Sequence, residues 1–271
     1  MLSVASVIIA AAAAVGLYIG YQRVVPLIES AGCDASDAGQ VVSLNASQAG
    51  IAATIAGVAA RDSLPPQAVT VAYAAALQES KLQNLPFGDR DSVGVFQQRP
   101  SQGWGTASQL EDPVYATSKF FGALTQIPGY ERLPVYQAAQ AVQHSADGQA
   151  YQQYQPMAEH MASAFTGQRP HAVWCWYPRK IGGRPDTEAV TLELSRTFGQ
   201  LPATSIADPG LSVGVSSPGN GWAVAGWLIS HAQQYQIDSV RYAGYLWSAA
   251  DGSRGWVRSV STATPGSIQL G

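Results

Sequence analysis

Apolar residues recur at intervals of three and four over much of residues 47–167, which predicts a mainly α-helical domain. A Gly- and Gln-rich segment at 85–106 breaks this period and predicts turns around a short hairpin near 93–97. Prolines at the beginning of several periodic runs are typical of first helical turns. The predicted helices cover 47–63, 66–83, 114–126, 135–145 and 150–166.

The pattern changes after Pro170 and predicts a second, smaller α+β domain over 168–262. A strand is expected at 171–177, and two further strands at 239–249 and 255–261 are joined by a turn at Asp251-Gly252. These would form a three-stranded sheet. Two helices are expected at 186–198 and 221–234, with a Pro-, Gly- and Ser-rich loop at 200–219 between them. The tail at 263–271 is expected to be disordered.

The N-terminal stretch 2–21 contains no charged residue, and twenty helical residues span about 30 Å, enough for a bilayer core. This predicts a transmembrane anchor over 1–22, with a cleaved signal peptide as the alternative. The segment 23–46 has weak periodicity and is expected to be a linker. The overall fold class is therefore α+β with an N-terminal transmembrane helix.

The fraction of charged residues and the net charge narrow the classes of function that the chain could have. Only 12% of the 271 residues are charged, against roughly 25% in an average globular protein. The net charge is −3 and the sequence pI about 5.8, so no basic field indicates a nucleic-acid partner. A polar, weakly charged surface fits a sugar-binding protein, although it also fits many exported proteins.

Cysteine and histidine spacing gives no indication of a metal or another cofactor. The two cysteines, Cys33 and Cys175, do not form a CxxC pair, and the four histidines lack zinc-type spacing. In an exported protein the cysteines can form a disulfide; the alternative is two unpaired thiols. Sequence alone does not decide between them.

Glu79 is the main candidate for chemistry. Its position in the periodic run that contains Val69, Tyr73 and Ala76 places it along the apolar stripe of the predicted helix. A single glutamate near a helix end is more often solvated. The loop that follows, however, carries groups suited to a sugar site, because aromatic faces stack on sugar rings and amides bind hydroxyls. These residues are Asp89, Asp91, Gln97, Gln98 and an exposed Trp104.

The string Glu79-Ser80…Ser92-Val93-Gly94-Val95-Phe96-Gln97 resembles the Glu-Ser…Ser-x-x-Gly-x-x-Gln pattern of the lysozyme-like lytic transglycosylases. The surrounding ALQESKLQN…GDRDSVGVFQQRPSQGWGT…DPVYA looks like an actinobacterial branch of that superfamily, and the resemblance covers about 47–167. It implies that Glu79 is the catalytic acid and base, and that Ser92 and Gln97 line the substrate cleft. The implied substrate is the β-1,4 bond between N-acetylmuramic acid and N-acetylglucosamine in peptidoglycan.

One departure from the family pattern leaves the mode of cleavage open. The family has an Ala-Tyr-Asn-Ala-Gly signature on a later helix, which we match to 140–145. There Gln143 can replace the amide, whereas Val142 has no hydroxyl. Hydrolysis with Asp91 or Asp89 as the partner of Glu79 is the alternative.

The remaining parts of the chain leave a non-enzymatic alternative open. Residues 170–261 are similar to a small domain found beside actinobacterial cell-wall enzymes. A catalytically degenerate wall-binding scaffold, or a component of a secretion or conjugation apparatus, would also fit this organisation. All of these alternatives place the chain in the cell membrane, with a single span and its domains on the cell-wall side.

Overall fold

The computed structural model describes residues 31–145, 148–178, 181, 183–207, 210–259 and 266–271. It is a mixed α+β structure with two antiparallel sheets. The anchor expected at 1–22 lies outside the described residues. Within the described part, no helix is both long enough and apolar enough to cross a membrane.

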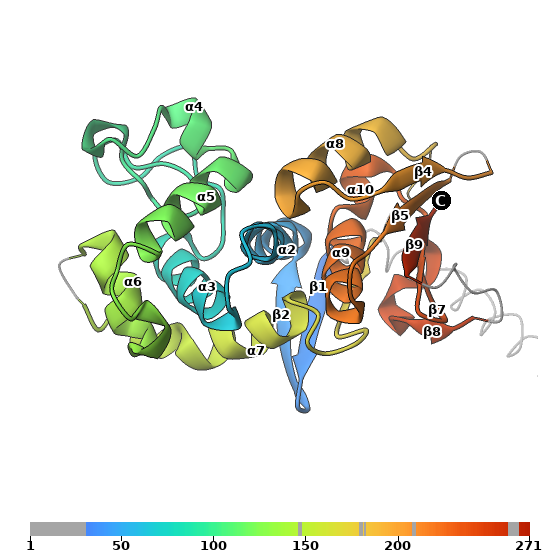
Figure 1. The fold of residues 1–271 in the computed structure, drawn as a ribbon, viewed down its shortest axis with the longest axis horizontal. Coiled ribbons are helices and arrows are strands. Elements are labelled where there is room, and N and C mark those ends of the chain that lie inside the picture. Colours follow the sequence, from blue (N-terminus) through green and yellow to red (C-terminus); the bar gives the residue numbers. More distant parts are fainter. Residues whose placement is uncertain (1–30, 146–147, 179–180, 182, 208–209, 260–265) are drawn as a thin grey trace, which may run out of the picture.

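Helix α3 (Pro66–Ser80) lies in the centre of the helical half (Figure 1). Its residues 68–77 are all buried, which is typical of a helix that is apolar on every side. Seven of these ten residues are alanine or valine, so neighbouring helices approach it closely. The helices that pack around it are α2 (Ala46–Arg61), α5 (Pro113–Leu124), α6 (Val135–Gln143) and α7 (Gln155–Phe165), and the short α4 (Ala107–Leu110) precedes α5.

Helix α2 connects the two halves of the molecule (Figure 1). It begins with a capping box between Asn45 and Gln48, and its residues 49–59 are all buried. One side packs on α3 and α5, and the other packs on α8 (Thr187–Phe198) and α9 (Pro218–Ser230). The approach to α8 requires a small residue, because a Cβ atom at Gly57 would lie 2.4 Å from Cγ2 of Thr197.

The prediction of a linker over 23–46 is wrong for residues 32–45. These residues form a hairpin of β1 (Gly32–Asp37) and β2 (Gln40–Asn45). The later strand β3 (Val173–Trp176) pairs with β1, which gives a three-stranded sheet in the order β2-β1-β3. In this register Cys33 lies opposite Cys175, and the two form a disulfide. The sheet predicted for the C-terminal half therefore lacks β3.

The C-terminal half instead contains a six-stranded sheet, in the order β4-β5-β9-β6-β7-β8. The loop expected at 200–219 contributes two of its strands, and the tail expected to be disordered contributes β9, which lies between β5 and β6. Alternate residues of β9 are buried, as expected for a strand with one face toward the core. The strands are β4 (Ala203–Ser205), β5 (Leu211–Gly214), β6 (Ser239–Tyr242), β7 (Tyr245–Ser248), β8 (Val257–Arg258) and β9 (Ser267–Leu270).

The single strand predicted at 239–249 is in fact a hairpin, with Ala243 and Gly244 at its turn. Both turn residues have positive φ values, 49° and 80°, as type I′ turns require. The Asp251-Gly252 turn lies in the short 3-10 segment η4 (Ala249–Arg254), not between two strands of a hairpin. The predicted helix over 221–234 is divided into α9 and the short α10 (Ala232–Tyr235).

We expect the disulfide to contribute strongly to stability, because it closes a loop with a sequence separation of 142 residues. Reducing the wild-type protein should lower the free energy of unfolding by about 2–5 kcal/mol in urea titrations. The Cys33→Ala/Cys175→Ala variant should have a free energy of unfolding slightly below that of the reduced protein, because removal of the buried sulfur atoms leaves a cavity. Its stability should not change when reductant is added. Equal urea midpoints for oxidised and reduced wild type would contradict this account.

Candidate active site

The candidate acid, Glu79, lies in the last turn of α3, and a polar contact fixes this helix end to the loop that follows. The Ser80 hydroxyl lies 2.7 Å from the Val95 carbonyl oxygen and 3.1 Å from that of Ala76. The helix then ends at Lys81, whose φ of 57° is left-handed and whose N–H donates to the Leu77 carbonyl. The position of Glu79 relative to the loop is therefore set by α3 and Ser80.

The Glu79 side chain is half-buried. Burial raises the pKa of its carboxyl group above the ordinary value, because charge is less well solvated there. Three groups oppose burial and favour the carboxylate: the hydroxyl of Tyr151, the amide of Gln143 and the ammonium of Lys81. The net shift is upward, so the protonated form persists to higher pH than in a solvated glutamate.

Tyr151 places a phenolic hydroxyl beside Glu79. Its Oη donates a hydrogen bond of 2.7 Å to Oε1 of Glu79, and its ring is fully buried. Burial, together with the nearby Glu79 carboxylate, raises the pKa of Tyr151, so the hydroxyl remains a donor. Val142, at the position where the transglycosylase signature has a tyrosine, is buried in the core. The missed signal is the pair Ala150-Tyr151 followed by a glutamine.

Gln143 lies at the C-terminal end of α6, beside Glu79. Its amide interacts with Glu79, and its Nε2 donates to the carbonyl of Phe96 over 2.9 Å. The Phe96 ring stacks on Phe120 of α5 with 4.5 Å between ring centroids. Gln143 thus connects the acid to a loop that is itself anchored in the core.

The predicted loop residues Ser92 and Gln97 mainly hold the loop in shape. Ser92 is buried and donates from Oγ to the Asp89 carbonyl over 2.7 Å. Gln97 donates from Nε2 to the Gly94 carbonyl over 3.1 Å. Gly94 has a φ of +78°, and a Cβ atom there would lie 2.2 Å from the Leu110 carbonyl oxygen, so only glycine fits.

The sequence also predicts that Gln98 and Trp104 bind substrate. In the structure the Gln98 side chain is buried and the Trp104 side chain is half-buried. Gln98 is 2% exposed, and its Nε2 donates to the carbonyl of Ala116 over 3.3 Å. Its Oε1 is buried without a hydrogen-bond partner among the described residues. Trp104, expected to be exposed, is half-buried and packs against the core. We therefore remove Gln98 from the candidate ligands.

The two loop aspartates differ in environment. Asp91 accepts hydrogen bonds from the Ser101 N–H (2.7 Å) and from Nε of Arg99 (2.8 Å). These bonds hold the pKa of Asp91 well below its usual range. Asp89 has a side chain that is 92% exposed, and its nearest cation is Arg90 at 3.9 Å. Neither aspartate is among the groups that shift the pKa of Glu79.

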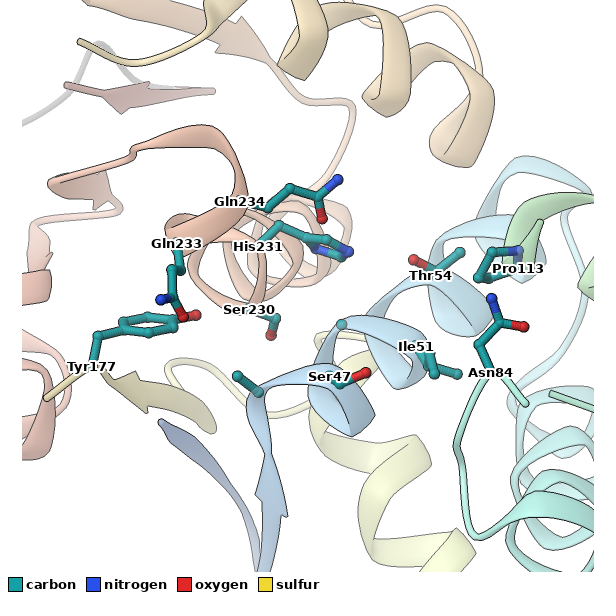
Figure 2. Close-up of a pocket in the computed structure, with 12 residues that line it drawn as sticks. Ser47, Ile51, Thr54, Asn84, Pro113, Tyr177, Ser230, His231, Gln233 and Gln234 are labelled. Carbon is teal, nitrogen blue, oxygen red and sulfur yellow. The ribbon is translucent and has the colours of Figure 1, made fainter. Parts of the chain in front are cut away.

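A cavity of about 450 Å³ lies away from these contacts, between α2 and the α9–α10 segment (Figure 2). Asn84 and Pro113 reach it from the helical half, but neither Glu79 nor Tyr151 lines it. Among the described residues, no group of three or more His, Cys, Asp or Glu side chains is arranged to hold a metal ion. Glu79 and the cavity are therefore separate features.

Comparison with known protein families found no match to this chain, and a search of curated proteins found no matching relative.

The raised pKa of Glu79 predicts a pH-dependent effect on stability. The folded protein binds a proton at Glu79 more tightly than the unfolded chain, so this group stabilises the fold below its unfolded pKa and that contribution is lost as pH rises. Glu79→Gln should therefore raise the midpoint of thermal unfolding at pH 7 relative to wild type, and the difference should shrink at pH 4. Glu131→Gln, at an exposed glutamate, is the control. A Glu79→Gln effect that does not vary with pH would contradict the assignment.

Proposed function

We propose that this protein is a peptidoglycan-cleaving enzyme that acts on the β-1,4 bond between N-acetylmuramic acid and N-acetylglucosamine, as a lytic transglycosylase. One observation carries the proposal: a half-buried glutamate with a raised pKa, at the end of a buried helix, accepts a hydrogen bond from a buried tyrosine. A carboxyl group of this kind is suited to general acid catalysis near neutral pH.

In the proposed mechanism, protonated Glu79 donates its proton to the glycosidic oxygen as the bond from that oxygen to the sugar C1 breaks. The Glu79 carboxylate then removes the proton from the 6-hydroxyl of the muramic acid residue. The 6-oxygen forms a bond to C1, which closes a 1,6-anhydro ring and returns the proton to Glu79. The Tyr151 hydroxyl orients the carboxyl group throughout and stabilises its ionised form between the two steps.

The state of the aspartates favours this mechanism over hydrolysis. A hydrolase of the two-carboxylate type needs a second carboxyl group at about 5–5.5 Å or 6.5–9.5 Å from the acid. Asp91 is held by Arg99 and Ser101, and Asp89 is exposed. The groups that act on Glu79 are Tyr151, Gln143 and Lys81, none of which carries a carboxyl group.

The disulfide supports a location outside the cytoplasm, because structural disulfides persist in oxidising compartments. We therefore propose that both halves of the chain face the cell wall and that residues 1–22 tether them to the membrane. Glycan strands are the proposed partner, and a secretion or conjugation assembly that needs local wall opening would be a further partner.

Glu79→Gln should decrease the release of muropeptides from purified sacculi by about 10²–10⁴-fold, the usual contribution of a positioned general acid. Mass spectrometry of the wild-type products should find anhydro ends, which weigh one water less than reducing ends. Reducing ends that require Asp91 or Asp89 would indicate hydrolysis instead. If wild type and Glu79→Gln both bind sacculi and neither cleaves them, the protein is a wall-binding scaffold.

Tyr151→Phe should separate positioning from packing. Loss of the hydroxyl should lower kcat by about ten- to a hundredfold, the equivalent of one hydrogen bond to a charged group. It should also raise the pKa of Glu79, so the fall in kcat/KM on the alkaline side should move to higher pH. Tyr242→Phe, which removes a hydroxyl bonded to the distant Pro218 carbonyl, should change neither quantity. A Tyr151→Phe profile that is not shifted would contradict the assignment of the hydroxyl as the donor that stabilises ionised Glu79.

A further inference from the structure

The cavity between α2 and α9–α10 is large enough for a small ligand. Its volume of about 450 Å³ falls within the range of roughly 300–1,000 Å³ that is usual for small-molecule sites. Figure 2 shows its two walls: Ser47, Ile51 and Thr54 come from α2, and the segment from Ser230 to Gln234 forms the opposite wall. Since α2 connects the helical half to the C-terminal half, the cavity lies where the two halves meet.

Every residue that lines the cavity is either apolar or polar and uncharged. Its hydroxyl groups belong to Ser47, Thr54, Ser230 and Tyr177, and its amides to Asn84, Gln233 and Gln234. No Asp, Glu, Lys or Arg is among the lining residues. A charged ligand such as a phosphate or a carboxylate would lose its hydration without gaining an opposite charge. The lining thus selects for an uncharged ligand with many hydrogen-bonding groups.

His231 is the one titratable imidazole in the lining, and its contacts fix its tautomer. Burial lowers its pKa to about 4, so the ring is neutral at physiological pH. Its Nδ1 lies 2.8 Å from the Trp227 carbonyl oxygen, which can only accept, so Nδ1 carries the proton. Nε2 is then an acceptor. It lies over the backbone of α2, where a Cβ atom at Gly50 would be 3.2 Å away.

The hydroxyl groups add donors beside this acceptor. Thr54 Oγ1 accepts from Nε1 of Trp227 over 3.3 Å, which leaves its own proton to donate. Ser230 donates to the Gly226 carbonyl over 2.8 Å, which leaves its lone pairs to accept. The walls therefore carry both donors and acceptors, and Ile51 and Pro113 add apolar surface beside them. Hydroxyls that both donate and accept, on a ring with C–H faces, match this arrangement.

We propose that the cavity between α2 and α9–α10 binds an uncharged saccharide of one or two rings, at a site separate from Glu79. The acceptor Nε2 of His231 and the hydroxyl of Thr54 bind sugar hydroxyls, and the amide of Gln233 at the rim adds a contact. The proposal does not depend on cleavage of glycan by Glu79, since no group that acts on Glu79 lines this cavity.

Isothermal titration calorimetry on the full chain tests this, with N-acetylglucosamine, diacetylchitobiose and cellobiose as neutral probes and glucose 6-phosphate as the charged probe. The experiment is run in the Glu79→Gln background to prevent turnover. At least one neutral sugar should bind, and Gly50→Ala should weaken that binding at least tenfold, because the added methyl group covers Nε2 of His231. The matched control is Gly122→Ala on α5, where a Cβ atom meets nothing within 4 Å, and binding should be unchanged.

Gln233→Ala gives a second variant that does not disturb the core, because this side chain is exposed, and it should also weaken binding. Sugar should slow amide hydrogen exchange in residues 46–54 and 230–234. The proposal is overturned if no neutral sugar binds or if glucose 6-phosphate binds as tightly. Circular dichroism should show that Gly50→Ala folds like wild type. The proposal is equally overturned if Gly50→Ala and Gln233→Ala both bind the sugar as tightly as wild type does, because the sugar would then bind elsewhere, such as beside Glu79.

Discussion

The chemistry proposed for this protein depends on the burial of residues 68–77 of α3. A helix that is apolar on every side must be surrounded, and α2, α5, α6 and α7 surround it. The polar end of such a helix emerges into a partly desolvated environment, and Glu79 lies at that end. The raised pKa of Glu79 is thus a consequence of how the core packs, and its first cause is burial.

The same packing brings the other site residues to Glu79 from distant parts of the sequence. Tyr151 is 72 residues from Glu79, and Gln143 reaches Phe96 across 47 residues. α6 and the residues that precede α7 contribute these groups because both helices pack directly on α3. The loop after α3 is fixed at Ser80 and at Phe96, so contacts connect the acid and its neighbours to the core.

The sequence predicted the elements whose signal is local and failed for those whose partners are distant. The 3.6-residue period and the proline positions predicted α2, α3, α5 and α8 to within a few residues. In contrast, β1 pairs with β3 about 140 residues later as well as with its hairpin partner β2, and β9 is only four residues long and lies between β5 and β6. Such short strands carry too few residues for an alternating pattern to be distinguished from loop composition.

The site shows the same division. Glu79 was predicted because its position on the helix and the motif around Ser92 and Gln97 are local features. Tyr151 was missed because the match at 140–145 offered an amide at Gln143 but no hydroxyl, and Tyr151 lies beyond that match and 72 residues from Glu79 in the sequence. The prediction that Trp104 is exposed was wrong. The burial of Trp104 depends on how the whole helical half packs, which no local pattern encodes.

The two opposing effects on Glu79 are both needed for the proposed reaction. Burial alone favours the protonated acid that the first step requires, but it would make the carboxylate of the second step costly. The Tyr151 hydroxyl stabilises that carboxylate without adding a second positive charge to that of Lys81, which already lowers the pKa of Glu79. A neutral donor beside a desolvated acid therefore keeps both protonation states accessible, and one residue is sufficient to act first as acid and then as base.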